Sequence, residues 1–463
     1  MPSDLRAAFD VQRAAFSLPD VPPPRERIAI LRALENAIRT RRARLVAAVN
    51  EDFGHRAEME TLSSEIAFTL TGIRHLRKHL KAWAKPRRGW SANPVPGRTR
   101  VLREPKGVVG IMSPWNYPLQ LALVPLATAL AAGNRVMLKP SERSPASSEA
   151  LAELLGDTFG DDLVAVALGG PDVAAAFSAL PFDHLFFTGS TETGRKVAEA
   201  AARNLTPVTL ELGGKSPCVM MPDAVPEAHA SLAAWGKWFS AGQTCVAPDY
   251  LLVPEGSADA WAAAMLDGAR AFLDPARRSA DYTSLIDASH AERLQAMLAE
   301  AEAGGARILR LDLGSEPRAR QMAPTVVLHA ARDSRLMTEE VFGPVLPIVE
   351  YRDLGHATAS IAKHPDPLAL YAFGTDAGAA RRFAEGVRSG GAAVNAAILH
   401  LAVHDLPFGG IGRSGMGAYH GERGFLEFSH QRSILVAPQS RFLRVLIPPY
   451  DGIARRMIER MAR

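Results

Sequence analysis

The segment that decides the fold is VVGIMSPWNYPLQLALVPLATALAAGNRVMLK, residues 108–139. It opens with a short apolar run at 108–112, continues with a longer apolar segment at 119–132, and closes with a second short run at 135–138. Short apolar runs are typical of buried strands, whereas the longer segment has the length of a buried helix. The segment therefore predicts a strand, a helix and a second strand that is parallel to the first.

The same alternation continues along the chain. Three further short apolar runs lie at 164–168, 185–187 and 208–212, and helical patterns lie near 147–158, 172–179 and 193–202. Repeated alternation of strand and helix favours an α/β fold, in which helices cover both faces of a parallel sheet. Ligands of such sheets bind outside the carboxyl ends of the strands. We therefore expect the functional residues in the turns that follow these runs, at 113–116, 139–142, 169–170, 188–190 and 213–214.

The regions on either side are expected to extend this core. Residues 1–16 and 25–85 have helical spacing of apolar residues. Residues 86–102, rich in Pro, Gly and Arg, are predicted to form a loop that leads into an edge strand. A second alternating section runs from about 215 to 410, and residues 416–463 end in a basic amphipathic segment.

Composition excludes several classes of protein. The chain has 463 residues, of which 47% are hydrophobic and 22% charged, as expected for a soluble protein of about three domains. A net charge of +4 is too small to indicate a nucleic-acid partner. The most apolar stretch, 119–133, is shorter than a membrane span requires, and residues 1–16 lack the apolar core of a signal peptide. Two cysteines in a chain of this length do not make a disulfide framework, and neither has a Cys or His at the spacing of a metal site. The expected compartment is therefore the reducing cytoplasm.

Cys245 is a candidate nucleophile. It follows the turn Gly242-Gln243-Thr244, between a predicted helix and a predicted strand. A lone cysteine is more often a small buried apolar residue, and this alternative stays open on the local sequence. Nucleophilic attack needs the thiolate, so a nearby base or dipole would have to assist. Cys218, in an apolar strand-like run, is predicted to be structural.

Glu211 is a candidate general base. Strand alternation places Val208, Leu210 and Leu212 on one face and Thr209 with Glu211 on the other. Burial at the end of an apolar strand would raise the pKa of the carboxyl group toward the range useful for a base. A salt bridge between Glu211 and Lys215 or an arginine is the alternative.

Two polar turns are weaker signals when taken alone. Asn116 could donate its amide N–H to an oxyanion, or it could instead cap the helix that starts near residue 118. The turn at 188–194, TGSTETG, opens a helix whose backbone N–H groups suit a pyrophosphate. Lys139, at a strand end, is a similarly weak signal.

These motifs, taken together in this order, resemble the aldehyde dehydrogenase superfamily. The CVAPDY stretch after the cysteine and GMGAYHGERGF near the end are similar to its class 3 branch. The stretches at 51–66, 72–88, 180–191 and 204–217 are similar to the bacterial coniferyl aldehyde dehydrogenases in particular. The matching motifs are PWNYP, LKPSE, FTGS, LELGGKSP, GQTC, EEVFGPV and LPFGGIGRSGMG.

The resemblance implies a fold with three parts. A Rossmann-type cofactor domain would comprise 1–86 and 103–212, an α/β catalytic domain 213–415, and a small bridging arm for oligomerisation 87–102 and 416–463. Class 3 relatives are typically dimers, so a homodimer is expected.

The resemblance also implies a role for each site residue. Cys245 would form a thiohemiacetal and then a thioester, Glu211 would activate the hydrolytic water, and Asn116 would stabilise the oxyanion. The implied cofactor is NAD, with NADP possible. The positions that would bind the cofactor are Lys139, Glu142, Gly189, Ser190, Glu340, Phe342 and Trp115.

The expected substrate is a small aldehyde that is oxidised to its carboxylic acid. Tyr117, Trp238 and His400 are predicted to bind it, and Trp235, Phe239 and Leu399 lie in segments expected to wall the same tunnel. Aromatic walls suit a planar cinnamyl aldehyde such as coniferyl aldehyde, although Trp235 and Phe239 could also simply pack the core. The alternatives are a medium-chain aliphatic aldehyde dehydrogenase, a thiol esterase or acyltransferase without redox chemistry, and a non-catalytic binding protein.

Overall fold

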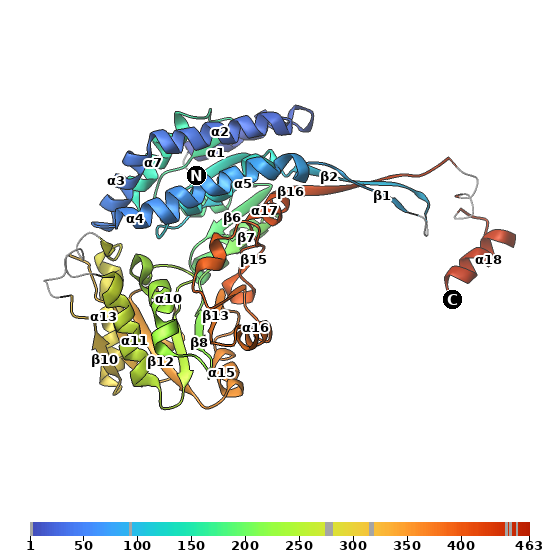
Figure 1. Ribbon diagram of the computed structural model, residues 1–463. Helices are drawn as coiled ribbons and strands as arrows, with labels where there is room; N and C mark the ends of the chain where they lie inside the picture. Colours follow the sequence, from blue (N-terminus) through green and yellow to red (C-terminus); the bar gives the residue numbers. More distant parts are fainter. Residues whose placement is uncertain are drawn as a thin grey trace.

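The computed structural model describes residues 3–91, 95–273, 281–313, 319–439, 443, 447–450 and 452–463. The described strands form sheets of six, seven and three strands. Figure 1 shows the two larger sheets in two bodies, one above the other, with a long β arm that extends to one side. The C-terminus lies beyond the far end of this arm.

The six-stranded sheet carries the segment with which the sequence analysis began. Its order is β15-β7-β6-β3-β4-β5, and its strands are parallel except for β15. The chain runs outward from β3 through β4 to β5 and then returns to β6, so the order reverses between β3 and β6. Ligands of such sheets bind at this reversal. All five predicted strands are confirmed: β3 (Val108–Met112), β4 (Arg135–Lys139), β5 (Val164–Val166), β6 (His184–Thr188) and β7 (Val208–Glu211).

Helices cover both faces of this sheet, and alternate residues of β3 separate the two cores. Val109 and Ile111 pack with α2 (Pro24–Thr40), α3 (Arg42–Phe53), α5 (Phe68–Trp83), α6 (Gln120–Ala132) and α7 (Pro145–Gly156). Val108 and Met112 pack with α1 (Ser3–Ala15), α8 (Pro171–Ser178) and α9 (Thr191–Ala202). Every residue of α6 is buried, which explains its lack of a polar face. Each buried Leu contributes about 1.5–3 kcal/mol relative to an exposed one.

The seven-stranded sheet has the order β10-β11-β12-β9-β8-β13-β14 and is parallel except for β10. The Cys245 loop precedes β9, so this sheet reaches the site with the amino ends of its strands. Its strands are β8 (Pro217–Met220), β9 (Tyr250–Pro254), β10 (Arg307–Arg310), β11 (Thr325–Leu328), β12 (Val345–Tyr351), β13 (Ala369–Phe373) and β14 (Gly391–Val394). Its helices are α10 (Pro226–Trp238), α11 (Ala258–Phe272), α13 (Ala288–Ala303), α14 (Arg335–Thr338), α15 (Leu354–Ile361) and α16 (Ala377–Glu385).

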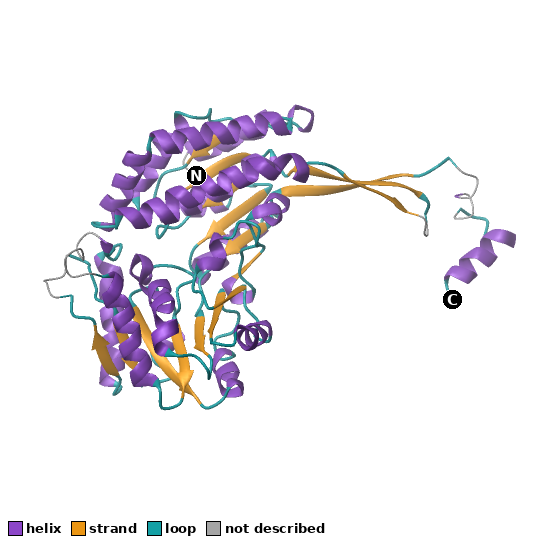
Figure 2. Cartoon of the chain, in the orientation of Figure 1, coloured by secondary structure: helices purple, strands orange, loops and turns teal. Residues whose placement is uncertain are grey.

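The arm corrects one sequence prediction. Residues 86–102 do not form a loop that leads into an edge strand, because β1 (Arg87–Ser91) and β2 (Gly97–Pro105) form a hairpin. β2 is the central strand, since β16 (Ser429–Val436) pairs along its whole length on the other side. Figure 2 shows the three strands as one twisted ribbon. The pairing of β2 with β16 joins segments more than 320 residues apart, which no local pattern could predict.

The remaining elements close the structure. β15 (Gly415–Met416) pairs with β7, and α17 (Gly421–Glu427) packs on α5 and α6, so residues 415–427 join the first body to the arm, where Glu422 pairs with Arg103 of β2 at 3.0 Å. The basic segment after Pro449 forms α18 (Gly452–Met461). Within the described ranges, no helix combines the length and the apolar character that a membrane span needs. Nor do the described residues group three or more His, Cys, Asp or Glu side chains as a metal site would.

Candidate active site

A cavity of about 280 Å³ lies where the carboxyl ends of the first sheet meet the amino ends of the second. It is bordered by the turns after β3, β6 and β7 and by the loops before β9 and β12, which are the positions that the topology makes available to a ligand. The sequence-predicted residues that line it are Trp115, Asn116, Gly189, Ser190, Glu211, Cys245, Glu340 and Phe342.

A second cavity, of about 250 Å³, reaches Cys245 from the opposite side. Its wall is strongly apolar and carries six Phe, Trp and Tyr side chains. Cys245 and Tyr419 border both cavities, so the thiol stands at their junction. The aromatic residues of its wall are Phe68, Trp235, Phe239, Phe408 and Tyr419, together with Tyr117 and His420.

The loop that presents Cys245 has an unusual backbone. Helix α10 ends at Trp238, and Ser240 and Ala241 then adopt left-handed conformations with φ of 53° and 52°. Gly242 continues the turn with φ of +72°, and a Cβ there would lie 2.3 Å from the carbonyl oxygen of Gly343. Only glycine fits such a position without displacing the neighbouring chain. The loop therefore fixes the thiol against the second sheet.

The surroundings of Cys245 oppose ionisation. Burial, with further contributions from Glu340 and Glu211, raises the pKa of Cys245 to about 12, and the backbone N–H groups of Cys245 and Val246 offset only part of this effect. The thiol of the protein alone is thus protonated at neutral pH, and attack on a carbonyl requires removal of its proton.

This environment makes a prediction about chemical reactivity. In the absence of cofactor, the rate of Cys245 alkylation by iodoacetamide should rise about tenfold per pH unit from pH 7 to 10, because the thiolate fraction grows by that factor below the pKa. Mass spectrometry of the modified protein measures the rate, and a Cys245→Ser variant gives the background from buried Cys218. A rate that levels off below pH 9 would contradict the prediction.

Glu211 is the last residue of β7 and is buried between β6 and β15. Neither carboxyl oxygen has a hydrogen-bond partner among the described residues. Burial, with a smaller contribution from Glu427, raises the pKa of Glu211 well above its ordinary value. The alternative of a salt bridge with Lys215 is wrong, because the Lys215 ammonium contacts Asp249 and donates to the carbonyl oxygen of Leu336 at 2.8 Å.

Asn116 lies in the turn between β3 and α6 and is buried. Its Nδ2 donates to the carbonyl oxygen of Gln243 at 3.1 Å, which ties this turn to the Cys245 loop. The alternative role as a helix cap is wrong. Helix α6 begins at Gln120, and Glu65 Oε2 accepts the N–H groups of Leu119 and Gln120 at 2.7 and 3.2 Å.

The larger cavity has the features of a dinucleotide site. Gly189 and Ser190 line the cavity and directly precede α9, whose N-cap is Ser190, and the start of a helix suits a pyrophosphate. A Cβ on Gly189 would lie 2.5 Å from the Phe187 ring, and one on Gly213 would lie 2.0 Å from Glu340 Oε2. Glycine at these two positions thus lets the Phe187 ring and the Glu340 carboxyl group pack directly against the backbone at the cavity wall. Burial, with a further contribution from Asp249, raises the pKa of Glu340 to about 8.

Two predicted cofactor residues lie outside the lining of this cavity. Lys139 Nζ and Glu142 Oε2 are 3.1 Å apart and form an ion pair at the end of β4. Three basic side chains of the lining escaped the sequence analysis: Arg143, His290 and Arg293. Arg143 lies over the Trp115 ring at 4.9 Å, and His290 contacts the carbonyl oxygen of Phe342 at 2.8 Å. No local motif marks these residues.

The predicted substrate residues are corrected at two positions. Tyr117 lines the smaller cavity, with its hydroxyl 2.6 Å from Thr244 Oγ1. Trp238 does not, because it is buried in the core and donates to the carbonyl oxygen of Pro344. His400 does not either, since its ring packs between Tyr371 and Phe408. Helical spacing turns Trp235, not Trp238, toward the cavity.

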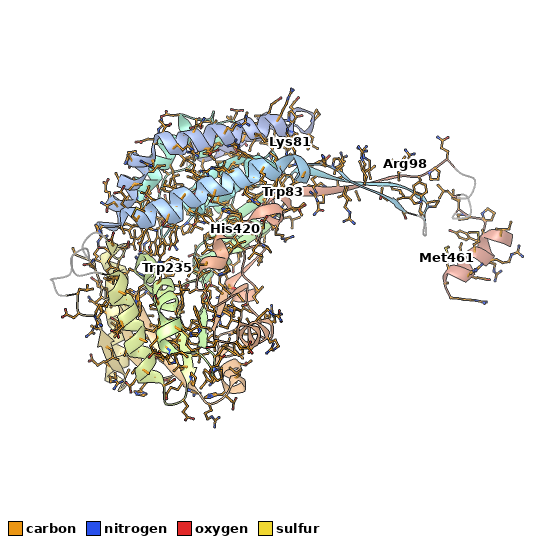
Figure 3. The ribbon with its side chains drawn as sticks, viewed as in Figure 1. Lys81, Trp83, Arg98, Trp235, His420 and Met461 are labelled. Atoms are coloured by element: carbon orange, nitrogen blue, oxygen red, sulfur yellow. The ribbon has the colours of Figure 1, made fainter. Side chains whose placement is uncertain are left out.

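His420, which the sequence analysis missed, also borders the cavity. Figure 3 shows Trp235 on α10 in the lower body and His420 in the region where the two bodies meet. The cavity wall thus draws residues from both bodies.

Comparison with known proteins gives a consistent result. A sequence profile described as the aldehyde dehydrogenase family matches residues 2–434. A probable coniferyl aldehyde dehydrogenase of Pseudomonas aeruginosa is 42% identical over 99% of this chain and 96% of its own. A dog protein named aldehyde dehydrogenase, dimeric NADP-preferring, is 36% identical over 94% of this chain and 96% of its own.

Comparison with solved structures also finds proteins named as aldehyde dehydrogenases. The substrate-bound state of Staphylococcus aureus AldH superposes with a TM-score of 0.92 at 36% identity, covering 99% of each chain. A Mycobacterium tuberculosis aldehyde dehydrogenase complexed with NAD+ superposes with a TM-score of 0.86 at 28% identity, covering 95% of this chain and 91% of its own.

Proposed function

The chain belongs to the aldehyde dehydrogenase family, and from this premise we propose that it oxidises aromatic aldehydes of the coniferyl type through a covalent intermediate on Cys245. The observation that carries the substrate class is the smaller cavity, whose aromatic wall leads to the thiol. Planar rings stack on such walls with about 0.5–1.5 kcal/mol per aromatic pair beyond the burial of area.

The proposed chemistry assigns one role to each of three side chains. The Cys245 sulfur attacks the aldehyde carbon to form a thiohemiacetal, and the Asn116 amide with the Cys245 N–H stabilises the oxyanion. NAD, when bound, supplies the hydride acceptor. Glu211 then takes a proton from water, which attacks the resulting thioester and releases the carboxylic acid. The raised pKa of Glu211 and its lack of partners support this role, because a base needs both a proton affinity and free oxygens.

NAD(P) use follows from the family, and the preference between the two forms is a proposal. Trp115, Gly189, Ser190, Glu340 and Phe342 would hold the cofactor. Glu142 would repel a 2′-phosphate, but it is half exposed and paired with Lys139. Repulsion at 4 Å in water is about 1 kcal/mol, so we expect NAD to be preferred over NADP by about tenfold or less.

The test of the proposed substrate is a panel of kcat/KM values with coniferyl aldehyde, benzaldehyde and hexanal, followed as absorbance growth at 340 nm. Coniferyl aldehyde should exceed hexanal by at least about tenfold, which corresponds to about 1.4 kcal/mol. Hexanal as the better substrate would replace the proposal with a medium-chain aldehyde dehydrogenase. The absence of NADH formation with every aldehyde would favour a thiol esterase.

A matched pair of variants ties the preference to the cavity. Trp235→Leu removes a ring from the wall and should lower the ratio of coniferyl aldehyde to hexanal about threefold to tenfold. Trp90→Leu changes an exposed ring on the arm and should leave the ratio unchanged. Equal effects of both substitutions would contradict the assignment of the wall.

We also propose a cytoplasmic homodimer. The three-stranded arm extends away from the body that carries it, and this shape supports contact with a second copy. The name of the dog relative describes that protein as dimeric. Both cysteines of the chain are free, which supports a reducing compartment.

A further inference from the structure

A buried ion pair interrupts the hydrogen bonds at the start of α6. A helix that continued back to Asn116 would join the Gln120 N–H to the Asn116 carbonyl oxygen. Instead, Arg56 Nη1 donates to the Asn116 carbonyl at 2.6 Å, and Glu65 Oε2 accepts the Gln120 N–H at 3.2 Å. The first helical bond is that from the Leu121 N–H to the Tyr117 carbonyl, at 3.0 Å. The backbone hydrogen bond between the Gln120 N–H and the Asn116 carbonyl is therefore absent, and Glu65 and Arg56 bind its donor and its acceptor instead.

The pair is built into the core. Arg56 and Glu65 side chains are fully buried, with Nη1 3.7 Å from Glu65 Oε1. The guanidinium lies over the rings of Phe53 and Tyr117, at 4.8 and 4.7 Å from their centres. Burial of two charges is costly, and a pair of apolar side chains commonly serves stability as well or better. A structural demand other than stability, namely a particular backbone conformation nearby, would explain why charged side chains occupy these positions.

That demand is the conformation of Asn116. Asparagine near the first turn of a helix readily caps the free N–H groups there. Glu65 occupies the N–H groups of Leu119 and Gln120, and Arg56 occupies the carbonyl of Asn116 itself. The Asn116 side chain is therefore free to donate a hydrogen bond to the Gln243 carbonyl oxygen and to line the cavity at Cys245.

We propose that Arg56 and Glu65 are positioning residues, which hold Asn116 outside helix α6 so that its amide faces the reacting carbon. This inference rests on the proposed role of Asn116 as the oxyanion donor. The pair acts through Asn116 and does not touch the aldehyde.

The main test replaces the pair with apolar side chains of similar length. Arg56→Met combined with Glu65→Met should lower kcat about tenfold to a hundredfold, since misplacement of a reacting group by 1 Å can cost a hundredfold. The KM for NAD should stay within twofold, because Gly189, Ser190 and Glu340 lie on other elements. A kcat within twofold of the wild type would overturn the proposal.

A double-mutant cycle separates positioning from general damage. Asn116→Ala alone should lower kcat by about 10²–10³. Added to Asn116→Ala, the Arg56→Met and Glu65→Met changes should lower kcat no further, because their effect passes through a side chain that is already absent. A further loss as large as in the wild-type background would overturn the proposal. Normal kcat of Asn116→Ala would refute the oxyanion role instead.

Two more variants guard against misfolding. Glu35→Met removes another buried carboxylate that pairs with arginines, on α2, and should lower the melting temperature but leave kcat unchanged. Arg56→Lys keeps the charge beside Glu65 but loses the reach to the Asn116 carbonyl. If the double variant does not fold, Arg56→Lys should still lower kcat about fivefold, and only where Asn116 is present; an unchanged kcat would overturn the proposal.

Discussion

Replacement of Cys245 by Ser is expected to lower kcat for aldehyde oxidation by at least about 10⁴-fold, while the protein still binds NAD. A serine hydroxyl ionises far less readily than a thiol, and loss of the nucleophile from a catalytic set commonly removes nearly all of its rate enhancement. Cys245 is the only thiol that borders both cavities in the described part of the chain. No neighbour is placed to replace it.

The measurement is NADH formation at 340 nm, with NAD binding followed separately by quenching of protein fluorescence. Cys218→Ala is the matched control, because Cys218 is fully buried in β8 and lines neither cavity. This variant should keep kcat within about twofold. Turnover by Cys245→Ser at more than a hundredth of the wild-type rate would exclude Cys245 as the nucleophile.

The second large effect is expected from Glu211→Gln. Without the base, hydride transfer still completes once, but the thioester is hydrolysed slowly, so a rapid burst of NADH should precede a steady rate that is about 10²–10⁴-fold lower. Stopped-flow absorbance resolves the two phases. Glu350→Gln is the control, since Glu350 accepts a hydrogen bond from the Ala258 N–H and borders neither cavity. A normal steady rate in Glu211→Gln would show that Glu211 is structural.

The same substitution should stabilise the fold at alkaline pH. The pKa of Glu211 in the folded protein lies well above its ordinary value, so the folded state binds the proton more tightly than the unfolded state. The stability that this proton contributes is complete below the ordinary pKa and is lost as pH rises through the folded pKa. A neutral Gln avoids this loss, so its gain in melting temperature over the wild type should be larger at pH 8 than at pH 5. Calorimetry at both values checks the sign.

The stabilisation and the loss of rate have one physical cause. The two oxygens of Glu211 have no partner among the described residues, which is unfavourable for a buried carboxylate. The same isolation leaves the oxygens free to take a proton from water. An equal gain at both pH values would indicate better packing of the amide, and not the removal of an ionisable group.

The parts that the sequence predicted well are those that depend on near neighbours. The runs at 108–112 and 208–212 became β3 and β7 because apolar β-forming residues are set off by turn residues at each end. Their parallel pairing then followed from the helices between them. Since the carboxyl ends of parallel strands meet at one edge, the turns that hold Asn116, Gly189 and Glu211 were also predictable as neighbours.

Predictions that needed the direction of a side chain were less secure. Trp238 and His400 share segments with residues that line the smaller cavity, yet neither side chain lines it. One residue along a helix rotates the side chain by about 100°, so membership of a segment does not place a side chain on one face. Contacts between residues that lie far apart in the sequence cannot be predicted from the spacing of residues at all.

What the sequence by itself determined is therefore the order of strands and helices and the chemical groups of the site: an amide, a carboxyl group and a thiol on three separate turns. Only the tertiary structure decided how each of them is held. Glu65 caps α6, Arg56 binds the Asn116 carbonyl, and β16 completes the arm beside β2. The physical reason is range, because local propensity acts within a few residues, whereas these contacts join residues 54, 60 and more than 300 positions apart.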